Sequence, residues 1–398
     1  MKSLQDRTRP EREIVDHFGH SSLWHAFRSE RPSRGQSDLR LREVSEIWER
    51  IARPSPARAY SVRVSCAMFT AIAGDMPIAE IRREHLLDFR DALGRFPNRL
   101  RREDLSLTPE ERYQGWARKG RDDRPTLAPS TIAGKVHNIA GLVSFAYAER
   151  LIMCNALKGL RLSHTPACRR RSFSKDELRR LLALPFFTRP WLRPWPQRTR
   201  PLLISQTTIR WLFVLGMMTG ARIEELGQLQ LRDVREQDGV WLIRITDLGV
   251  RGDRTAKRLK SPSARRSVPL HRRIKDLGFL RLMHERDAAG SGWLFDDLVP
   301  NARGKRTHSA VCRCGRVIDQ ITRDPAVIFH SLRHTFKDLC RAAGIEDSIN
   351  DQLTGHAPPM IGRAYGDGVD CAALSAAVNR LDFEFIDWEP IIRAVSQQ

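Results

Sequence analysis

A short polar segment divides the chain into two periodic regions. It reads His164-Thr165-Pro166-Ala167-Cys168-Arg169-Arg170-Arg171, so a proline and three consecutive arginines stand between stretches of regular apolar spacing. Such a segment is typical of an exposed linker. The chain has 398 residues, which is enough for two domains that each bury a core. The sequence therefore predicts a domain boundary at this segment.

The region before the linker is predicted to be helical. Its first apolar residues recur at the spacing of one helix face: Leu41, Val44, Ile47, Trp48 and Ile51. Two further amphipathic helices are expected over 78–93 and 130–151, the second beginning at Pro129 or Ser130. The pattern indicates an all-α domain over 41–165.

Three stretches are expected to lie outside regular structure. Residues 1–40 are polar, without periodicity, and are interpreted as an arm. Residues 97–129 are polar and are expected to form a long loop or a partly ordered insertion. Residues 185–201 contain five prolines and are predicted to be irregular.

The region after the linker mixes helices and strands. Ser174 begins a Ser-x-x-Glu capping box, and the apolar run 211–218 predicts a buried helix. A turn at Asp238-Gly239 opens a β-branched and aromatic strand over 240–245. A second strand is expected over 266–270, where a proline near the end is typical of an edge strand.

The charge of the chain favours an anionic partner. The sequence has 68 Lys and Arg against 47 Asp and Glu, a net charge of +21, and residues 251–273 hold nine basic residues against one acidic residue. No apolar stretch reaches the ~18 residues of a membrane span, and the basic stretches lack the aromatic face of a membrane-surface helix. Nucleic acid is the better fit, and no membrane partner is expected. Residues 1–7 lack an apolar signal segment, so a cytoplasmic, nucleoid-associated location is expected.

One group of residues resembles half of a zinc site. His308, Cys312 and Cys314 lie close in sequence, but the second pair that a zinc site needs is missing. No metal site and no cofactor are therefore expected.

Two segments carry groups that can bind an anion together. Arg222 follows a glycine turn and has Glu225 three residues later, which also fits a purely structural ion pair. His330 and Arg333 are three residues apart, on one helix face that is expected to point away from the core. A histidine beside an arginine that it cannot neutralise indicates a shared anion. Further on, His356 precedes Tyr365 by nine residues.

The segments TGARIEEL, HSLRHTF and LTGH, with a tyrosine nine residues after the last histidine, together resemble the tyrosine recombinase (phage integrase) family. The resemblance covers 171–370 through residues in the family's order: Arg222, Lys260, His330, Arg333, His356 and Tyr365. It extends more loosely to 41–165 as the family's helical core-binding domain. It implies a mostly α catalytic domain with a small antiparallel β-sheet (α+β), preceded by an all-α core-binding (SAM-like) domain that clamps DNA.

The resemblance implies a metal-free and ATP-free cleavage of DNA. Arg222 and Arg333 would bind the phosphate oxygens, and Tyr365 would attack to give a 3′-phosphotyrosyl link and a free 5′-hydroxyl. A phenol has an ordinary pKa of about 10, so it must lose its proton as it attacks. His330 would assist this proton transfer, and His356 would hydrogen-bond the scissile phosphate.

Lys260 is assigned as general acid to the 5′-oxygen, with Lys257 as the competing assignment. Glu225 is expected to orient the neighbours of Arg222. Residues expected to contact DNA are Arg169, Arg170, Arg171, Lys257, Arg258, Arg265 and Arg266. The segment 371–398 resembles the family's tail that docks on a neighbouring protomer, and packing in cis is the alternative.

The leading hypothesis is a site-specific recombinase or integrase of a mobile genetic element, which acts as a homo-tetramer on double-stranded DNA. One alternative is a DNA-relaxing enzyme similar to type IB topoisomerases. Another is a DNA-binding protein with a decayed active site, although every catalytic position of the pattern is filled. Assembly on DNA distinguishes the first two.

Overall fold

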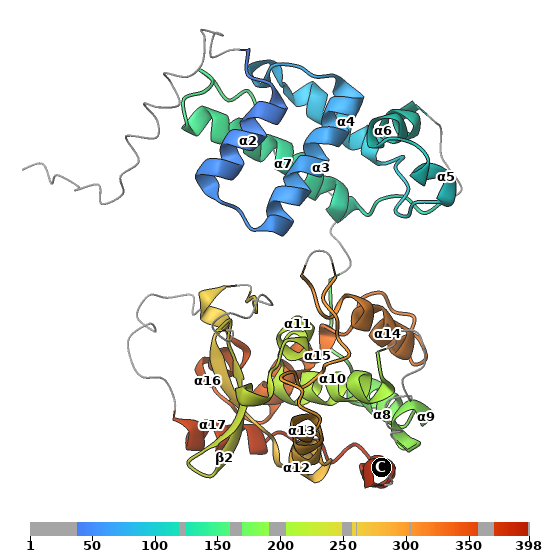
Figure 1. The fold of residues 1–398 in the computed structure, drawn as a ribbon, viewed down its shortest axis with the longest axis vertical. Helices are drawn as coiled ribbons and strands as arrows, with labels where there is room; N and C mark the ends of the chain where they lie inside the picture. The colour runs from blue at the N-terminus through green and yellow to red at the C-terminus, as the bar shows by residue number, and fades with distance from the viewer. Residues whose placement is uncertain are drawn as a thin grey trace, which may run out of the picture. The chain divides into compact units, whose positions relative to one another are not determined.

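The computed structural model describes residues 38–118, 124–159, 169–190, 204–248, 257–259, 261–301, 304–356 and 370–396. The chain divides into two compact units, Met1–Ala167 and Cys168–Gln398, each with its own hydrophobic core (Figure 1). Residues 1–37 of the expected arm and residues 164–168 of the expected linker lie outside the described residues. The domain roles assigned to 41–165, 171–370 and 371–398 stay predictions.

The described part of the first unit is helical. Its elements are α2 (Leu41–Ala52), α3 (Pro56–Ala73), the 3₁₀ turn η2 (Ile78–Glu80), α4 (Arg83–Leu93), α5 (Arg102–Leu105), α6 (Pro109–Arg118) and α7 (Pro129–Ala148). Helices α3 and α7 pack on each other, and both contact α2 and α4. The core between them includes Val44, Phe69, Phe89 and Leu142. This all-α unit confirms the predicted class.

Two expectations for the first unit are wrong in detail. The helix expected over 78–93 is interrupted, because Ile81 and Arg82 are extended and α4 starts anew, with the His85 ring accepting from the Arg82 amide at 3.0 Å. The stretch 97–129, expected to form a long loop or a partly ordered insertion, contains the helices α5 and α6 among its described residues, so the expectation of a long loop is wrong. Helix α6 is held by Trp116, which is buried against Phe96 with 5.3 Å between ring centroids.

The second unit is mostly helical and contains one three-stranded antiparallel sheet. Its helices are α8 (Lys175–Leu182), α9 (Pro185–Thr188), α10 (Gln206–Thr219), α11 (Ile223–Gly227), α12 (Arg272–Asp276), α13 (Phe279–Ala288), α14 (His308–Ile318), α15 (Ser331–Ala342), α16 (Asp347–Thr354), α17 (Cys371–Asn379) and α18 (Glu389–Ser396). Its 3₁₀ turns are η3 (Leu231–Asp233) and η4 (Pro262–Ala264). The α+β prediction for this unit is confirmed.

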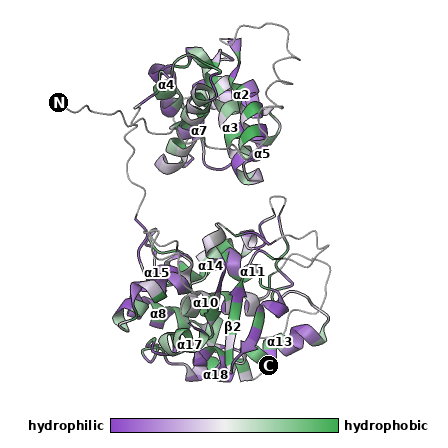
Figure 2. Ribbon diagram, turned by 90° about the vertical axis from the view of Figure 1, so that its left-hand side faces the viewer, coloured by the Kyte–Doolittle hydropathy of each residue, from purple (hydrophilic) through white to green (hydrophobic). Residues whose placement is uncertain are grey.

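The sheet has the order β1-β2-β3, formed by Val234–Gln237, Val240–Ile245 and Arg266–Pro269. Strands β1 and β2 join through Asp238 and Gly239, whose φ angles of 51° and 75° give the left-handed hairpin turn that matches strand twist. The central strand β2 is mostly hydrophobic (Figure 2). The pairing Ile243↔Val268 makes β3 an edge strand, where its terminal proline is tolerated.

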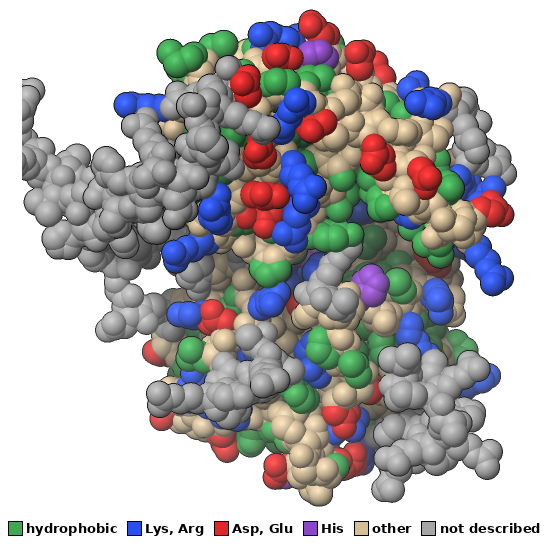
Figure 3. Space-filling model, turned by 45° about the horizontal axis from the view of Figure 1, so that its top comes forward, with side chains coloured by type: hydrophobic (Ala, Val, Ile, Leu, Met, Phe, Trp, Pro, Cys, Tyr) green, Lys and Arg blue, Asp and Glu red, His purple; other side chains and the backbone are tan. Residues whose placement is uncertain are grey.

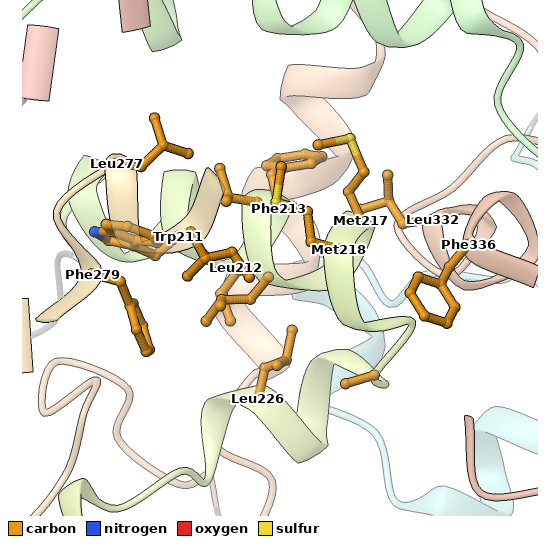
Figure 4. Close-up of a cluster of buried hydrophobic side chains, with 14 of the residues drawn as sticks. Trp211, Leu212, Phe213, Met217, Met218, Leu226, Leu277, Phe279, Leu332 and Phe336 are labelled. Carbon is orange, nitrogen blue, oxygen red and sulfur yellow. The ribbon is translucent and has the colours of Figure 1, made fainter. Parts of the chain in front are cut away.

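Helix α10 forms the centre of the second unit. Ser205 caps its start by accepting from the Thr208 amide at 3.0 Å, and Gly220 ends it. Every residue from Thr207 to Thr219 is buried, and Trp211 lies against Phe279 with ring centroids 5.1 Å apart (Figure 4). Because α10 also packs on α15, the core fixes the two helices that carry the predicted motifs.

Two segments of the second unit differ from or refine the expectations. The proline-rich stretch begins with α9, where Pro185 stands at the first helical position and Phe187 is buried; 191–203 lie outside the described residues. In the C-terminal segment, Leu374, Phe383 and Trp388 belong to the core of their own unit. The segment thus packs in cis, and docking on another protomer stays a prediction.

Candidate active site

Arg222 stands at the junction of two helices. Gly220 ends α10 with a φ of 61°, and Arg222 is the N-cap residue of α11. Glu225 accepts from the Arg222 amide at 2.9 Å and from its Nη1 at 2.6 Å. One carboxylate therefore fixes both the start of α11 and the direction of the guanidinium. The Arg222 side chain keeps 23% exposure, so it can still reach a ligand.

Arg333 is buried, which corrects the expectation that it points away from the core. It lies on α15, and its guanidinium donates to the carbonyl of Gly220 at 2.8 Å and to the carbonyl of Thr354. Its Nη2 also lies 3.1 Å from Nδ1 of His356. Arg333 thus joins the end of α10 to the end of α16, because unpaired carbonyls at helix ends need donors.

The two candidate histidines come from the ends of two helices. His330 is the N-cap residue of α15 and is exposed, and its ring lies 5.3 Å from the His334 ring, edge to face. His356 follows Gly355, the left-handed C-cap of α16, and its Nδ1 lies 3.1 Å from Oγ1 of Thr354.

One open pocket of about 730 Å³ brings together four of the six predicted catalytic residues: Arg222, His330, Arg333 and His356. The other lining residues are Arg170, Arg171, Ser172, His334, Lys337, Asp338 and Arg341. Lys260 and Tyr365 lie outside the described residues, so their roles stay predictions.

The pocket favours an anion. Burial and the nearby Arg222 and Arg266 lower the pKa of Arg333 to about 10, which still leaves it charged at neutral pH. Burial, Lys337 and Arg333 lower the pKa of His356 to about 4, so this ring is neutral at pH 7. The arrangement can hold a tetrahedral anion between fixed cations and offer it a neutral imidazole.

Glu225 connects this site to the sheet. Its side chain is 4% exposed, and Oε2 accepts from Nη2 of Arg266 at 2.8 Å. Burial acts to raise the pKa of Glu225, but Arg266 and Arg222 outweigh it and lower the pKa. The ionised carboxylate thus lies between two guanidiniums.

Two residues expected to contact DNA are buried instead. Lys257 pairs with Asp233, and the two side chains are 1% and 4% exposed. The Arg266 side chain is 3% exposed and faces Glu225. Neither can reach a phosphate backbone from these positions, because each cation is enclosed with its carboxylate.

The other expected DNA contacts lie at the surface. Arg258 is exposed, and Arg265 is 55% exposed while it donates twice to Asp247, at 2.6 and 3.0 Å. On the face that Figure 3 shows, Lys and Arg side chains alternate with Asp and Glu rather than forming one uniform patch. Their contact with DNA stays a prediction.

The three consecutive arginines of the linker differ in their surroundings. Arg169 is exposed, and Arg170 donates to the carbonyl of Pro325. Arg171 donates twice to Glu177, at 2.8 and 2.7 Å, and once to Asp324 at 2.7 Å. Arg171 therefore ties the start of the second unit to α8, in addition to lining the pocket.

Lys337 is one of the pocket residues that the sequence did not single out. It lies on α15, four residues after Arg333 and seven after His330, so helical spacing alone places it on the same face. Its Nζ lies 3.1 Å from Oδ1 of Asp351. The charged side chain lies near His356 and is one cause of the lowered pKa of that histidine.

The residues of the suspected half metal site all lie on α14. Its two cysteines differ in their surroundings, because Cys312 is exposed and Cys314 is buried. Among the described residues, no group of three or more His, Cys, Asp or Glu could hold a metal ion. Within the same part of the chain, no helix is long and apolar enough to cross a membrane.

A comparison with protein-family models finds no match, and neither does a comparison with curated proteins. Solved structures do match. A lambda integrase tetramer bound to a Holliday junction is 14% identical, with a TM-score of 0.50, over 88% of this chain and 85% of the other. The Tn1549 transposon integrase in complex with transposon right end DNA is 13% identical, with a TM-score of 0.52, over 90% of this chain and 99% of the other. The chain has the fold of these integrases.

Proposed function

We propose that this chain is a site-specific DNA recombinase, an integrase-type DNA strand-transferase that cleaves and rejoins strands through a 3′-phosphotyrosyl intermediate. The observation that carries the proposal is the convergence of Arg222, His330, Arg333 and His356 on one cationic pocket. These residues come from three separate segments, and the fold that gathers them is shared with integrases.

The proposed cleavage step conserves atoms and charge. The phenolic oxygen of Tyr365 attacks the phosphorus, the bond from phosphorus to the 5′-oxygen breaks, and a 3′-phosphotyrosyl ester forms. His330 accepts the phenol proton, and Lys260 donates a proton to the departing 5′-oxygen. Attack by another 5′-hydroxyl reverses the step and rejoins the strands, so neither ATP nor a metal ion is needed.

Fixed donors supply the rate enhancement in this proposal. Arg222 and Arg333 bind the non-bridging oxygens, and each is already oriented by a protein acceptor: Glu225 at 2.6 Å for Arg222 and the Gly220 carbonyl at 2.8 Å for Arg333. Donors held in place before the reaction need no reorganisation as charge develops. His356 donates to the same phosphate.

The proposed substrate is double-stranded DNA, on which the protein assembles as a homo-tetramer. One neighbouring structure is an integrase tetramer on a Holliday junction, and the first unit takes the role of a DNA clamp in this proposal. Arg169, Arg170, Arg258 and Arg265 contribute contacts to the backbone around the scissile phosphate.

A nicked duplex tests the cleavage chemistry. The duplex carries the junction sequence that flanks the gene, and the nick lets the cleaved fragment diffuse away so that the covalent adduct accumulates. The adduct is expected to survive denaturation, to form in EDTA and to disappear in Tyr365→Phe. Tyr147→Phe, at an exposed tyrosine of the first unit, is the matched control. An adduct that persists in Tyr365→Phe, or cleavage that requires Mg²⁺, would refute the mechanism.

Plasmid substrates separate recombination from DNA relaxation. A recombinase exchanges strands between two plasmids that each carry the site and leaves a plasmid without the site supercoiled. Relaxation of a site-free plasmid without any exchange would identify a relaxing enzyme instead. Binding of the site without cleavage would indicate a decayed active site.

A further inference from the structure

Arg266 connects three separate parts of the second unit. Its side chain is buried on β3 at 3% exposure. Nε donates to the carbonyl of Leu353 at 2.7 Å, Nη1 to the carbonyl of Ala264 at 2.8 Å, and Nη2 to Glu225 at 2.8 Å. The rigid fork of a guanidinium holds its donors in fixed directions, so one side chain serves three separate acceptors here. Arg266 therefore joins α16, the turn η4 and α11.

On one side, Arg266 acts through Glu225 on Arg222. The same carboxylate accepts from the Arg222 amide, from its guanidinium and from Arg266. Without Arg266, Glu225 would be a buried carboxylate with one guanidinium fewer, and burial would raise its pKa. A protonated Glu225 accepts more weakly, so Arg222 would lose its fixed direction.

On the other side, Arg266 acts on the end of α16. Two successive carbonyls there are each taken by an arginine, that of Leu353 by Arg266 and that of Thr354 by Arg333. A Cβ atom on Gly355 would lie 2.9 Å from Nη1 of Arg266, so the helix end packs directly on this guanidinium. His356 is the next residue, and its backbone direction follows from this packing.

We propose that Arg266 is a positioning residue, which holds Arg222 through Glu225 and His356 through the end of α16 in the one arrangement that binds the scissile phosphate. The proposal rests on the proposed recombinase function and deepens it. Arg266 itself contacts neither the phosphate nor the DNA backbone, because its side chain is buried and, unlike Arg333, does not line the pocket.

The test compares Arg266→Gln and Arg266→Lys with the wild-type chain, using the nicked duplex in single-turnover adduct formation and a separate measurement of duplex affinity. We expect Arg266→Gln to slow adduct formation by about 10- to 100-fold while duplex affinity changes by less than about threefold. Arg266→Lys keeps the charge and one donor direction, so part of the rate returns.

The pH profile distinguishes positioning from general support of the fold. Glu225 must be ionised to hold Arg222, so the rate falls as the pH falls through the Glu225 pKa. In Arg266→Gln this decline is expected at a higher pH than in the wild-type chain. Arg210→Gln is the matched control, because Arg210 is another buried arginine of this unit, which lies near the start of α10, away from the site at its end, and donates to the carbonyl of Phe186. It is expected to lower the melting temperature without moving the pH profile.

Each outcome decides the proposal. If the wild-type chain forms no adduct, the proposed function fails first. If it does, and Arg266→Gln cleaves at the wild-type rate or loses duplex affinity with an unchanged rate once bound, the positioning role is wrong. If Arg266→Gln does not fold, Gly355→Ala disturbs the same contact from the other side. A folded Gly355→Ala variant with an unchanged rate and pH profile would also overturn the proposal.

Discussion

Nη2 of Arg333 lies 3.1 Å from Nδ1 of His356, and this contact fixes the tautomer of the histidine. An arginine can only donate, so Nδ1 must accept. Oγ1 of Thr354 also lies 3.1 Å from Nδ1, and its rotatable hydroxyl can donate to this nitrogen or to the carbonyl of Asn350 at 2.7 Å. The proton of the neutral ring therefore sits on Nε2, which leaves His356 a donor toward the pocket.

His356 is expected to stay neutral across the physiological pH range. Burial, Lys337 and Arg333 hold its pKa near about 4, so its NMR signals should titrate there rather than near the ordinary value. Comparison with His356→Gln assigns the signals. Lys337→Gln removes a neighbouring cation and should raise the pKa. An unchanged titration in Lys337→Gln would contradict this electrostatic assignment.

His271 should make the second unit sensitive to acid. It is 2% exposed, its Nδ1 accepts from the Arg273 amide at 3.1 Å, and burial is the main cause that lowers its pKa to about 4. In the unfolded chain His271 takes up a proton near pH 6.5, whereas in the folded chain it does so only near pH 4. Stability from this group is therefore complete above pH 6.5 and falls as the pH drops toward 4.

Urea unfolding at pH 5 and pH 7.5 measures this effect. His271→Asn keeps a side-chain acceptor at the start of α12 and removes the titrating group. Between pH 7.5 and pH 5 the variant should lose less stability than the wild-type chain, because it lacks the one histidine that takes up a proton on unfolding. Equal losses in both proteins would exclude His271 as the cause.

Gly220→Ala should destabilise the fold and disturb the site together. The residue has a φ of 61°, and a Cβ atom would lie 2.6 Å from Cδ1 of Phe336 in the core (Figure 4). We expect a loss of about 2–4 kcal/mol in the free energy of unfolding from strain and overpacking. Gly239→Ala is the control, since its φ is 75° but nothing lies within 4 Å, so about 1–2 kcal/mol is expected there. Equal losses at both glycines would show that the Phe336 contact is unimportant.

The sequence motifs predicted which residues gather, but not how deeply each is buried. Arg222, His330, Arg333 and His356 were found from spacing and resemblance, and they line one pocket. Spacing on α15 gave the correct helix face, yet Arg333 is buried there because α10 and α16 close over it. Such long-range packing leaves no local signal.

The same limit explains the errors on charged residues. Lys257 and Arg266 lie in a basic stretch that is typical of a DNA-binding surface, and their acidic partners Asp233 and Glu225 are far away in sequence. A count of charges along the sequence cannot show that Lys257 and Arg266 each have an acidic partner. For a related reason, the sequence does not predict helix α6. The helix is anchored by a single aromatic residue, Trp116, and has no apolar stripe that periodicity would reveal.

The two candidate lysines should separate in a leaving-group experiment. Lys260→Ala is expected to slow cleavage of the normal substrate and to recover on a duplex with sulfur in place of the scissile 5′-oxygen, because a thiolate leaves without a proton donor. Lys257→Met is expected to show no such rescue. Its main effect should be a loss of about 3–5 kcal/mol in stability, because Asp233 remains buried without its cation. Rescue of Lys257→Met alone would reverse the assignment.

Glu225 accepts from both Arg222 and Arg266, and these two guanidiniums lie near enough to Arg333 to lower its pKa. Each neighbouring guanidinium disfavours the charged form of the others, so an anion bound in the pocket would relieve their repulsion. The repulsion between these guanidiniums lowers the stability of the folded protein. Inorganic phosphate or sulfate should therefore raise the melting temperature of the free protein, and Arg222→Gln should weaken that response.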